Sequence, residues 1–271
     1  MPLAIVRGGG DLATGIVYRL WKIGFTILVL ETSRPTVIRR PVSVAQAIFE
    51  RERTHTIDGM RIAVISRTLL TRETPDDGSV RVAVDPMGDS IARLKPTLLV
   101  DAIMAKRNCG TTRDMAPRVV AIGPGFKAPR DVHAVVETMR GHDLGRVITD
   151  GEAAPNTGVP GEIGGKSLDR IVRSPAKGTA CFNVAIGDNV KEGQIIGSVG
   201  EASVSACTCG VVRGLIHPSV SVSVNMKIGD IDPRAKRENC FSISDKSLAI
   251  AGGVIEAALS AKDNLGLYLR L

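Results

Sequence analysis

The first residues with recognisable chemistry form a glycine-rich stretch near the start of the chain. Gly8 permits a tight turn, and Gly10 lets the backbone approach a pyrophosphate group. Phosphate at this turn would meet the N-terminus of a following helix, where backbone N–H groups and the helix dipole favour negative charge. Glu31 lies at the distance along the chain where an acidic side chain can accept hydrogen bonds from a ribose. The candidate residues for binding such a ligand are Gly8, Gly10, Asp11, Ala13, Thr14 and Glu31.

The elements needed to position this turn follow one another in the right order. Residues 3–6 predict a short buried strand, residues 16–22 the first turns of a helix, and residues 25–30 a second strand that leads into Glu31. Ala13 is small enough for the helix to pack on the strand. The pattern predicts an α/β Rossmann-like domain with a site for a dinucleotide such as NAD. Two other interpretations remain open, in which the glycines serve packing alone or the ligand is another phosphate compound.

Further candidates follow other predicted strands at residues 60–65, 98–103 and 119–122. Loops after the carboxyl ends of such strands face the ligand crevice in open α/β sheets. Lys106 and Arg107 follow the strand that contains Asp101. The basic residues Arg34, Arg39 and Arg40 follow the second strand and could meet phosphate or carboxylate groups. The additional candidates for cofactor binding are Arg39, Arg40, Asp101, Gly123 and Gly125.

Four polar residues in the segment 131–143 are candidates for proton transfer: His133, Glu137, His142 and Asp143. The many β-branched residues favour a strand, whereas the spacing of His133 and Glu137 also fits one face of a helix. In either conformation these two side chains would share a face, so acid–base and ligand-binding roles both remain open. A structural hydrogen-bonded pair is the alternative.

Composition limits the classes of partner. The formal net charge of +7 favours acidic ligands, whereas eight aromatic residues (Trp 1, Tyr 2, Phe 5) argue against nucleic-acid binding by base stacking. No apolar run approaches the length of a membrane span, and Arg7 and Asp11 interrupt any secretory signal, so we expect no membrane association and a cytoplasmic location. Five irregularly spaced cysteines suit a reducing compartment. Cys207 and Cys209 supply at most two metal ligands, so no metal site is predicted.

The pattern of apolar, glycine and proline residues predicts three parts. They are a Rossmann-like nucleotide-binding domain at 1–165, a β-rich domain at 166–243, and a C-terminal helix at 244–271 that packs back on the rest of the chain. The first ends in a Gly- and Pro-rich connection at 150–165. In the second, a motif running from Val190 to Gly197 recurs from Val222 to Gly229, with Asn225 in place of Gly193.

The repeat resembles the halves of biotinyl and lipoyl carrier domains, which predicts a small barrel-sandwich hybrid. The connection between the two halves, residues 201–205, lacks the lysine that such carriers modify, so no covalent biotin or lipoate is expected. Asp230, Asp232 and Arg234 follow the second half and predict a salt-bridged turn, with a metal or active-site role as the alternative.

Several long strings of residues are similar to those of the YqeB family of accessory proteins for selenium-dependent molybdenum hydroxylases. They span nearly the whole chain: residues 6–15, 35–40, 101–108, 122–126, 131–147, 156–161, 210–216, 227–234 and 241–256. The resemblance implies a role in maturing a molybdenum hydroxylase, with the apo-enzyme as protein partner. It also implies a molybdopterin-type cofactor as a candidate ligand alongside NAD, and it gives no catalytic residue to transfer.

Two functions from different classes therefore compete. The first is a maturation factor that binds a nucleotide or molybdopterin-type cofactor through Gly8, Gly10 and Glu31 with Arg39 and Arg40. The second is an NAD-dependent oxidoreductase acting on a small substrate, with His133 and Glu137 or His142 and Asp143 transferring protons. A redox or selenium-carrying role for Cys109, which follows a predicted strand end, is a further hypothesis.

Overall fold

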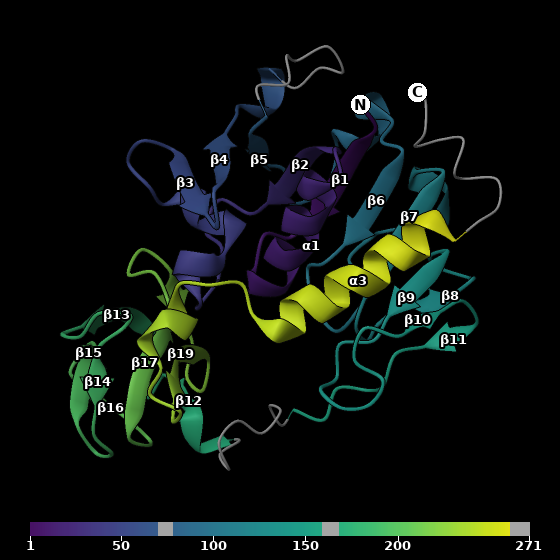
Figure 1. The fold of residues 1–271 in the computed structure, drawn as a ribbon. Helices are drawn as coiled ribbons and strands as arrows, with labels where there is room; N and C mark the ends of the chain where they lie inside the picture. Colours follow the sequence, from purple (N-terminus) through teal and green to yellow (C-terminus); the bar gives the residue numbers. More distant parts are fainter. Residues whose placement is uncertain (70–77, 159–167, 261–271) are drawn as a thin grey trace. The chain divides into compact units, whose positions relative to one another are not determined.

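The computed structural model describes residues 1–69, 78–158 and 168–260. The chain divides into two compact units, drawn together in Figure 1. Unit 1 consists of Met1–Ser33, Ser43–Asn156 and Ile243–Leu271, and unit 2 of Arg34–Val42 and Thr157–Ser242. No pattern in the sequence predicts that residues 34–42 join the second unit. The connection predicted at 150–165 lies outside the described residues from 159 onward, as does the end of the predicted C-terminal segment, 261–271.

Unit 1 begins with the predicted strand, turn, helix and strand. These are β1 (Leu3–Arg7), α1 (Asp11–Lys22) and β2 (Thr26–Glu31), so the local elements are confirmed. The sheet has a hydrophobic core on each face. Alternate residues of β1 pack into one core or the other, because successive side chains of a strand point to opposite faces. Ala4 and Val6 pack on the side of α1, and Ile5 packs on the other side.

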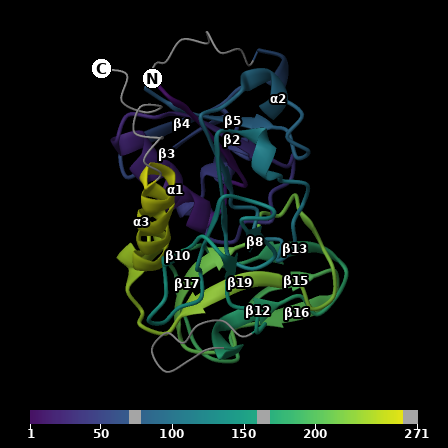
Figure 2. The same cartoon turned by 90° about the vertical axis from the view of Figure 1, so that its right-hand side faces the viewer.

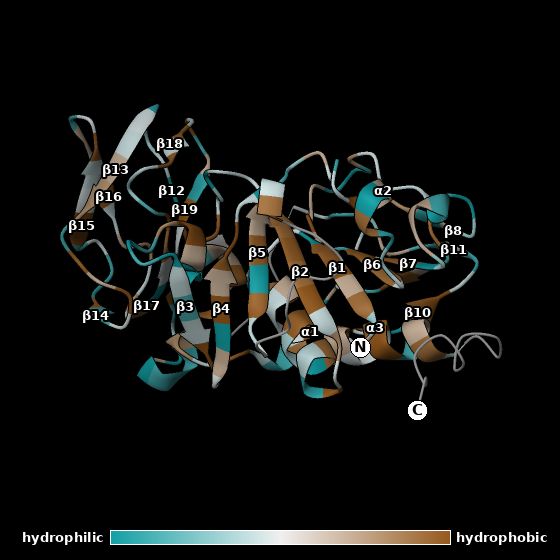
Figure 3. Cartoon of the chain, turned by 90° about the horizontal axis from the view of Figure 1, so that it is seen from above, coloured by the Kyte–Doolittle hydropathy of each residue, from teal (hydrophilic) through white to brown (hydrophobic). Residues whose placement is uncertain are grey.

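A nine-stranded mixed sheet organises unit 1, in the order β10-β9-β7-β6-β1-β2-β5-β4-β3. The strands from β9 across to β4 run parallel, and β10 and β3 are antiparallel edge strands. Figure 3 shows β1 and β2 as mostly hydrophobic, as expected for strands covered on both faces. The remaining strands of this sheet are β3 (Thr54–Ile57), β4 (Met60–Val64), β5 (Val80–Val84), β6 (Leu98–Asp101), β7 (Arg118–Ile122), β9 (Ala134–Val136) and β10 (Val147–Ile148).

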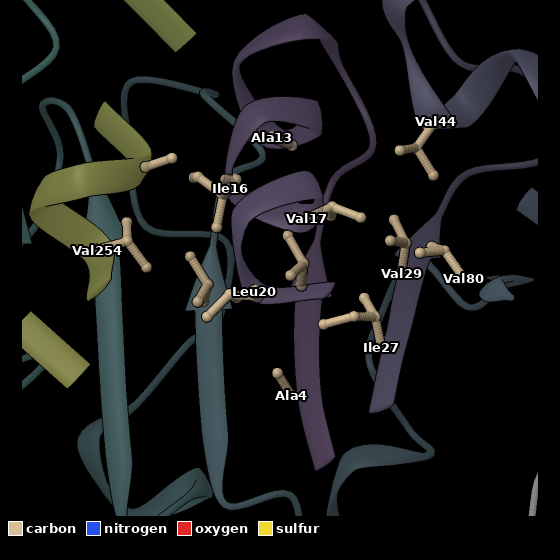
Figure 4. Packing of buried hydrophobic residues seen from close by; sticks show 14 of the residues in the cluster. Ala4, Ala13, Ile16, Val17, Leu20, Ile27, Val29, Val44, Val80 and Val254 are labelled. Atoms are coloured by element: carbon tan, nitrogen blue, oxygen red, sulfur yellow. The ribbon is translucent and has the colours of Figure 1, made fainter. Parts of the chain in front are cut away.

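Two helices cover one face of the sheet, α1 and α3 (Asp245–Leu259). Figure 4 shows the packing beneath α1, where Ile16, Val17 and Leu20 meet Ala4 and Ile27. Burying each large aliphatic side chain contributes about 1.5 to 3 kcal/mol. Ser244 caps α3 as predicted, and its hydroxyl accepts a hydrogen bond from the Ser247 N–H at 3.2 Å.

Small residues let α3 approach its neighbours. The Gly15 N–H of α1 donates to the Ser247 hydroxyl at 3.0 Å, and a Cβ at Gly15 would collide with that side chain. A Cβ at Gly253 would collide with the Gly145 carbonyl oxygen, whereas a Cβ at Gly252 would meet open space. The close packing predicted for the glycine pair is therefore confirmed for Gly253 alone.

The other face of the sheet is covered by loops and by α2 (Ile91–Leu94), which is four residues long. Two minor strands, β8 (Lys127–Ala128) and β11 (Gly151–Glu152), pair with each other. Short 3-10 turns complete the connections: η1 (Arg40–Val42), η2 (Val44–Ile48), η3 (Arg67–Leu69), η4 (Arg113–Met115), η5 (Leu168–Arg170) and η6 (Arg237–Cys240). Across the described ranges, no helix is both long and apolar enough to cross a membrane.

Unit 2 contains two four-stranded antiparallel sheets, β12-β19-β17-β14 and β16-β15-β13-β18. Figure 2 shows β12, β19 and β17 as neighbours in the first of them. The repeat is confirmed locally, since Gly193 and Asn225 both have positive φ, at 77° and 65°. The strands are β12 (Ile171–Arg173), β13 (Gly178–Phe182), β14 (Asn189–Val190), β15 (Ile195–Val199), β16 (Ala202–Ser205), β17 (Gly210–Leu215), β18 (Ser221–Val222) and β19 (Lys227–Asp232).

The predicted combination of a Rossmann-like domain with a barrel-sandwich hybrid is wrong. A Rossmann-like domain has helices on both faces of its sheet, whereas in the described part of unit 1 the two longer helices share one face and both sheet edges are antiparallel. Unit 2 recruits residues 34–42, which pack so closely on β17 that a Cβ at Gly214 would lie 2.7 Å from the Ile38 carbonyl oxygen. The fold is therefore a large mixed sheet joined to two antiparallel sheets.

Candidate functional site

The carboxyl ends of the central strands bring Arg7, Glu31 and Asp101 to one edge of the sheet. Arg7 of β1 pairs with Leu30 of β2 and with Asp101 of β6. The chain proceeds from β1 to β2 and β5 on one side, and later returns to β6 and β7 on the other. Ligands of open α/β sheets bind outside the point where this direction reverses. We call this place the β1–β6 switch point, and it is the candidate site.

A buried ionic cluster lies beneath the switch point. Arg7 and Asp101 are each 2% exposed. Arg7 Nη1 donates to the Thr111 hydroxyl at 2.6 Å and lies 3.8 Å from Asp101 Oδ2, and the Thr111 hydroxyl donates to the same carboxylate oxygen at 2.6 Å. Burial raises the pKa of Asp101, against the hydrogen bonds from Thr111 and the Ile103 N–H and the charge of Arg7. The cluster fixes the loop after β6 to the end of β1.

The glycine turn is held by Glu31. The Gly9 N–H donates to Glu31 Oε2 at 2.8 Å, and the Thr32 N–H donates to Oε1 at 2.7 Å. Burial raises the pKa of Glu31, and these N–H groups oppose the shift. The Gly9 carbonyl accepts from the Ala45 N–H at 2.9 Å. The backbone groups of Gly9 are thus already bonded within the protein, and Glu31 acts on the turn itself.

The other residues predicted for this turn have structural partners. Ala13 is buried in the core, and the buried Thr14 hydroxyl donates to the Gly10 carbonyl at 2.9 Å and accepts from the Val44 N–H at 3.0 Å. Gly10 is the half-buried N-cap of α1, and Asp11 lies in the first turn of that helix. These contacts position the N-terminus of α1 at the switch point.

The loop after β6 has an unusual backbone. Met104 and Lys106 have positive φ, at 60° and 62°, a conformation that costs non-glycine residues about 1 to 2 kcal/mol and clusters at functional sites. Lys106 and Arg107 are exposed. Gly125, at φ 109°, packs so closely on this loop that a Cβ there would lie 2.6 Å from the Arg107 nitrogen. Gly123, at φ 73°, adjoins Met104 and Thr138 in the same way. The loops after β6 and β7 therefore hold each other in place.

Arg39 and Arg40 belong to unit 2 rather than to the glycine turn's unit. Arg39 Nη2 donates to the Asn239 carbonyl at 3.1 Å, and Arg40 Nε donates to the Leu215 carbonyl at 2.8 Å. The sequence placed these arginines directly after a strand end, but the chain leaves unit 1 after Ser33 and rejoins it at Ser43. Their cofactor-binding role stays a prediction.

The structure separates His133 from Glu137. The segment forms strand β9, so the helical interpretation is wrong, and the two residues flank the strand at opposite ends, about 13 Å apart along it. Both oxygens of Glu137 accept backbone N–H groups, from Thr138 and Met139 at 2.6 Å and from Ala154 at 2.7 Å. His133 Nδ1 accepts the Val119 N–H at 3.0 Å. Each of these two side chains therefore binds backbone N–H groups of the protein itself.

In the second predicted pair, Asp143 pairs with an arginine rather than with His142. His142 and Asp143 are both exposed, and Asp143 forms an ion pair with Arg146 at 2.6 Å. A catalytic role for His133, Glu137, His142 or Asp143 stays a prediction.

The pH dependence of stability tests the contact of His133. Burial, followed by the charges of Arg113 and Arg118, lowers the pKa of His133 below its usual 6.5. The folded state therefore binds fewer protons than the unfolded state just below that pH, so this histidine makes stability fall as the pH decreases from about 6.5 through the folded pKa. We expect His133→Asn, whose amide oxygen can still accept the Val119 N–H, to lose less stability than wild type between about pH 7.5 and about pH 5 in urea titrations.

The matched control is His142→Asn, which changes an exposed histidine in the same unit and should keep the wild-type pH profile. Identical profiles for wild type and His133→Asn would contradict the assignment.

The cysteines lie at scattered places. Cys109 is half-buried in the loop after β6, where its thiol donates to the Arg107 carbonyl at 3.7 Å and its own carbonyl accepts from Arg7 at 3.2 Å. Cys207 donates to the Ile171 carbonyl at 3.6 Å, and burial raises the pKa of its thiol. Cys209 accepts the Glu192 N–H at 3.3 Å.

Sequence reasoning missed three residues of the site. Arg7 and Thr111 complete the cluster around Asp101, and Asp85, one residue after β5, accepts the Ser90 N–H and hydroxyl at 2.9 and 2.6 Å. Arg7 and Asp85 could have been found because each ends a buried apolar run at a strand's carboxyl end. Thr111 has no such signal, because only the folded loop brings it to Asp101.

No protein-family model matches the chain. Among solved structures, it shows a weak likeness to an aspartoacylase family protein from Mesorhizobium loti (12% identity, TM-score 0.25, covering 85% of this chain and 84% of that one). A succinylglutamate desuccinylase/aspartoacylase from Rhodobacter sphaeroides gives 13% identity and a TM-score of 0.27, over 85% and 84% of the two chains. TM-scores this low do not define a shared fold.

The chain is much closer to a curated relative, the Escherichia coli (strain K12) protein YqeB, which is described as uncharacterized. The two are 46% identical over 257 residues, which make up 95% of this chain and 47% of the relative. The chain thus spans about half the length of the relative it matches. The similarity therefore relates nearly the whole of this chain to about half of YqeB.

Proposed function

We propose that this chain is an accessory factor for the maturation of a selenium-dependent molybdenum hydroxylase, and that it binds a phosphate-bearing nucleotide or molybdopterin-type cofactor at the β1–β6 switch point. The family resemblance supports the first half of the proposal. The second half rests on one observation, the convergence at that point of the α1 N-terminus and a constrained loop with two exposed cations, Lys106 and Arg107. Such cations are suited to phosphate and carboxylate groups.

The charges at the switch point favour the loop after β6, rather than the glycine turn, as the place where a phosphate would bind. Glu31 already occupies the Gly9 N–H and would repel an anion at the glycine turn. The loop after β6 offers positive charge instead, on side chains that solvent can reach. The residues present therefore fit an anionic ligand whose phosphate lies toward Lys106 and Arg107.

The separation of His133 from Glu137 counts against an oxidoreductase that uses these two residues as a proton-transfer pair. Glu137 uses both carboxylate oxygens to hold backbone N–H groups, and His133 lies at the other end of its strand. A ligand-binding protein needs neither group to be available for proton transfer.

Ligand binding is tested by mass spectrometry of small molecules released from natively purified protein, followed by calorimetric titration with NAD, NADP and molybdopterin cofactors. We expect Lys106→Gln and Arg107→Gln each to weaken binding of the anionic ligand by about 3- to 10-fold, since each removes one charged contact to phosphate. Lys95→Gln is the matched control. Lys95 is also an exposed lysine with positive φ, at 47°. It precedes β6, whereas Lys106 and Arg107 follow this strand, so it lies near the opposite end of the strand.

The outcomes separate the candidate functions. A pterin that co-purifies and binds less well to the two variants supports the proposal, whereas tight NAD binding with the same losses favours the oxidoreductase. Unchanged affinity in both variants places the ligand elsewhere and contradicts the proposed site.

Maturation is tested in a host that lacks the gene. The hydroxylase purified from that host should contain less selenium or less molybdenum cofactor than the enzyme from the complemented host, with correspondingly lower activity. A hydroxylase with full selenium, molybdenum and pterin content would contradict the accessory role.

A further inference from the structure

A cluster of charged side chains, four of them buried, lies in unit 2. The glycine turn and the switch point, both in unit 1, contribute none of its residues. Its members are Arg170, Arg213, Arg234, Lys227, Asp230 and Asp232, and we call it the arginine cluster. Asp230 and Asp232 belong to β19, and Arg213 belongs to the neighbouring strand β17. The predicted salt-bridged turn is confirmed, because Arg234 donates to both oxygens of Asp232, at 2.9 and 2.7 Å.

A β-bulge positions Arg213. The pairing of β17 with β19 shifts register between Val212 and Gly214, so Arg213 is the extra residue on its strand. Bulges redirect side chains and are enriched next to binding and active sites. Here the bulge lies where the guanidinium of Arg213, with a residue exposure of 7%, reaches Asp232 at 3.3 Å.

The two carboxylates near Arg213 are each shared with another basic side chain. Asp232 is shared with Arg234, and Asp230 forms ion pairs with Arg170 at 2.7 Å and with Lys227 at 3.5 Å. The Nε atom of Arg213 is buried and has no hydrogen-bond partner among the described residues. Burial and then the nearby charge of Arg39 lower the pKa of Arg213, against the charges of Asp232 and Asp230.

Such an arrangement is costly for a protein on its own. A buried donor of a charged group that makes no hydrogen bond loses its hydration without replacement. Two cations that approach each other in a buried place also disfavour each other unless an anion lies near both. An oxyanion satisfies both requirements, because guanidinium groups bind phosphate and carboxylate oxygens through several N–H donors at once.

We propose that unit 2 has a second ligand site, in which Arg213 binds the phosphate group of a small molecule and Arg39 and Arg234 flank it. Access from solvent is provided by Arg234, whose side chain is 40% exposed, and by the half-buried Arg39. Inorganic phosphate and the phosphate group of a nucleotide have the same recognition chemistry, and the experiment distinguishes them. The site is independent of the proposed function at the switch point.

Calorimetric titration of the full chain tests this site, with inorganic phosphate and, separately, a nucleoside monophosphate, against sodium chloride of equal ionic strength. We expect saturable binding of one of them, weakened at least about tenfold in Arg213→Gln, because a charged hydrogen-bonding partner is removed. Arg173→Gln is the matched control. Arg173 is an exposed arginine of unit 2 that donates to the Asn225 carbonyl, and its loss should leave binding unchanged.

Thermal unfolding gives a second measurement if Arg213→Gln folds poorly. Phosphate should raise the Tm of wild type in a concentration-dependent way, and it should raise the Tm of Arg39→Gln less. Arg173→Gln should behave as wild type toward inorganic phosphate, since this exposed arginine of unit 2 lies outside the arginine cluster. Absence of saturable binding of both probes by wild type, or equal binding by wild type, Arg213→Gln and Arg39→Gln, would overturn the proposal.

Discussion

Arg7→Met is expected to lower the free energy of unfolding by about 3 to 5 kcal/mol, the range found when one partner of a buried ion pair is removed. Methionine has a similar length and keeps the apolar contacts of the side chain. The substitution leaves the Asp101 carboxylate, 2% exposed, without its cation, and removes the donors to the Pro86 and Cys109 carbonyls. Urea unfolding followed by fluorescence of Trp21, the one tryptophan of the chain, reports on unit 1.

Two further variants show whether the buried charge is the cause. Arg19→Met replaces an exposed arginine of α1 and should change stability by less than about 0.5 kcal/mol. Adding Asp101→Asn to Arg7→Met removes the unpaired charge, so the double variant should be more stable than the sum of the two single changes predicts. Strict additivity, or a loss below about 1 kcal/mol in Arg7→Met, would show that the cluster does not depend on this ion pair.

Gly8→Ala is expected to destabilise unit 1 by about 2 to 5 kcal/mol, with contributions from backbone strain and from overlap. Gly8 has φ 90°, and a Cβ there would lie 2.8 Å from the Ala102 carbonyl oxygen and 2.9 Å from the Ile103 Cα. Those are backbone atoms of the loop after β6, and the Arg7–Asp101–Thr111 contacts hold this loop in place. The overlap therefore cannot be relieved by turning a side chain.

Gly24→Ala isolates the backbone contribution. Gly24 has the same φ of 90°, but no atom lies within 4 Å of the position that its Cβ would take. The control should cost about 1 to 2 kcal/mol, and the excess loss in Gly8→Ala measures how tightly the two loops at the switch point pack. Equal losses in the two variants, measured by urea unfolding, would mean that the loop after β6 moves aside and that the switch point is not rigid.

Local elements were predictable where the sequence pattern is strong. The strand, turn, helix and second strand from β1 to β2 follow from apolar runs separated by glycine, and the cap of α3 follows from Ser244. The second half of the repeat in unit 2 was recognisable because Asn225 tolerates the positive φ that Gly193 adopts. Each of these predictions uses residues close together in the chain.

Predictions that needed distant contacts were less successful. The segment around His133 formed a strand because it pairs with β7, and that pairing put His133 and Glu137 at opposite ends. Arg39 and Arg40 follow a strand of unit 1 directly, yet their hydrogen bonds are to Asn239 and Leu215, about 200 and 175 residues away. Distance along the chain gives no information about such contacts.

The sequence by itself determined the glycine turn, the acidic residue that follows β2, the β repeat and the relation to the YqeB family. Only the tertiary structure determined which contacts these residues make and which of them are buried. In the folded chain, Glu31 accepts a hydrogen bond from the glycine turn, and Thr111 contacts both Arg7 and Asp101. Arg213 lies buried on a β-bulge beside Asp232. The physical reason is that turn and strand preferences act between neighbouring residues, whereas burial and charge pairing depend on which distant segments the fold brings together.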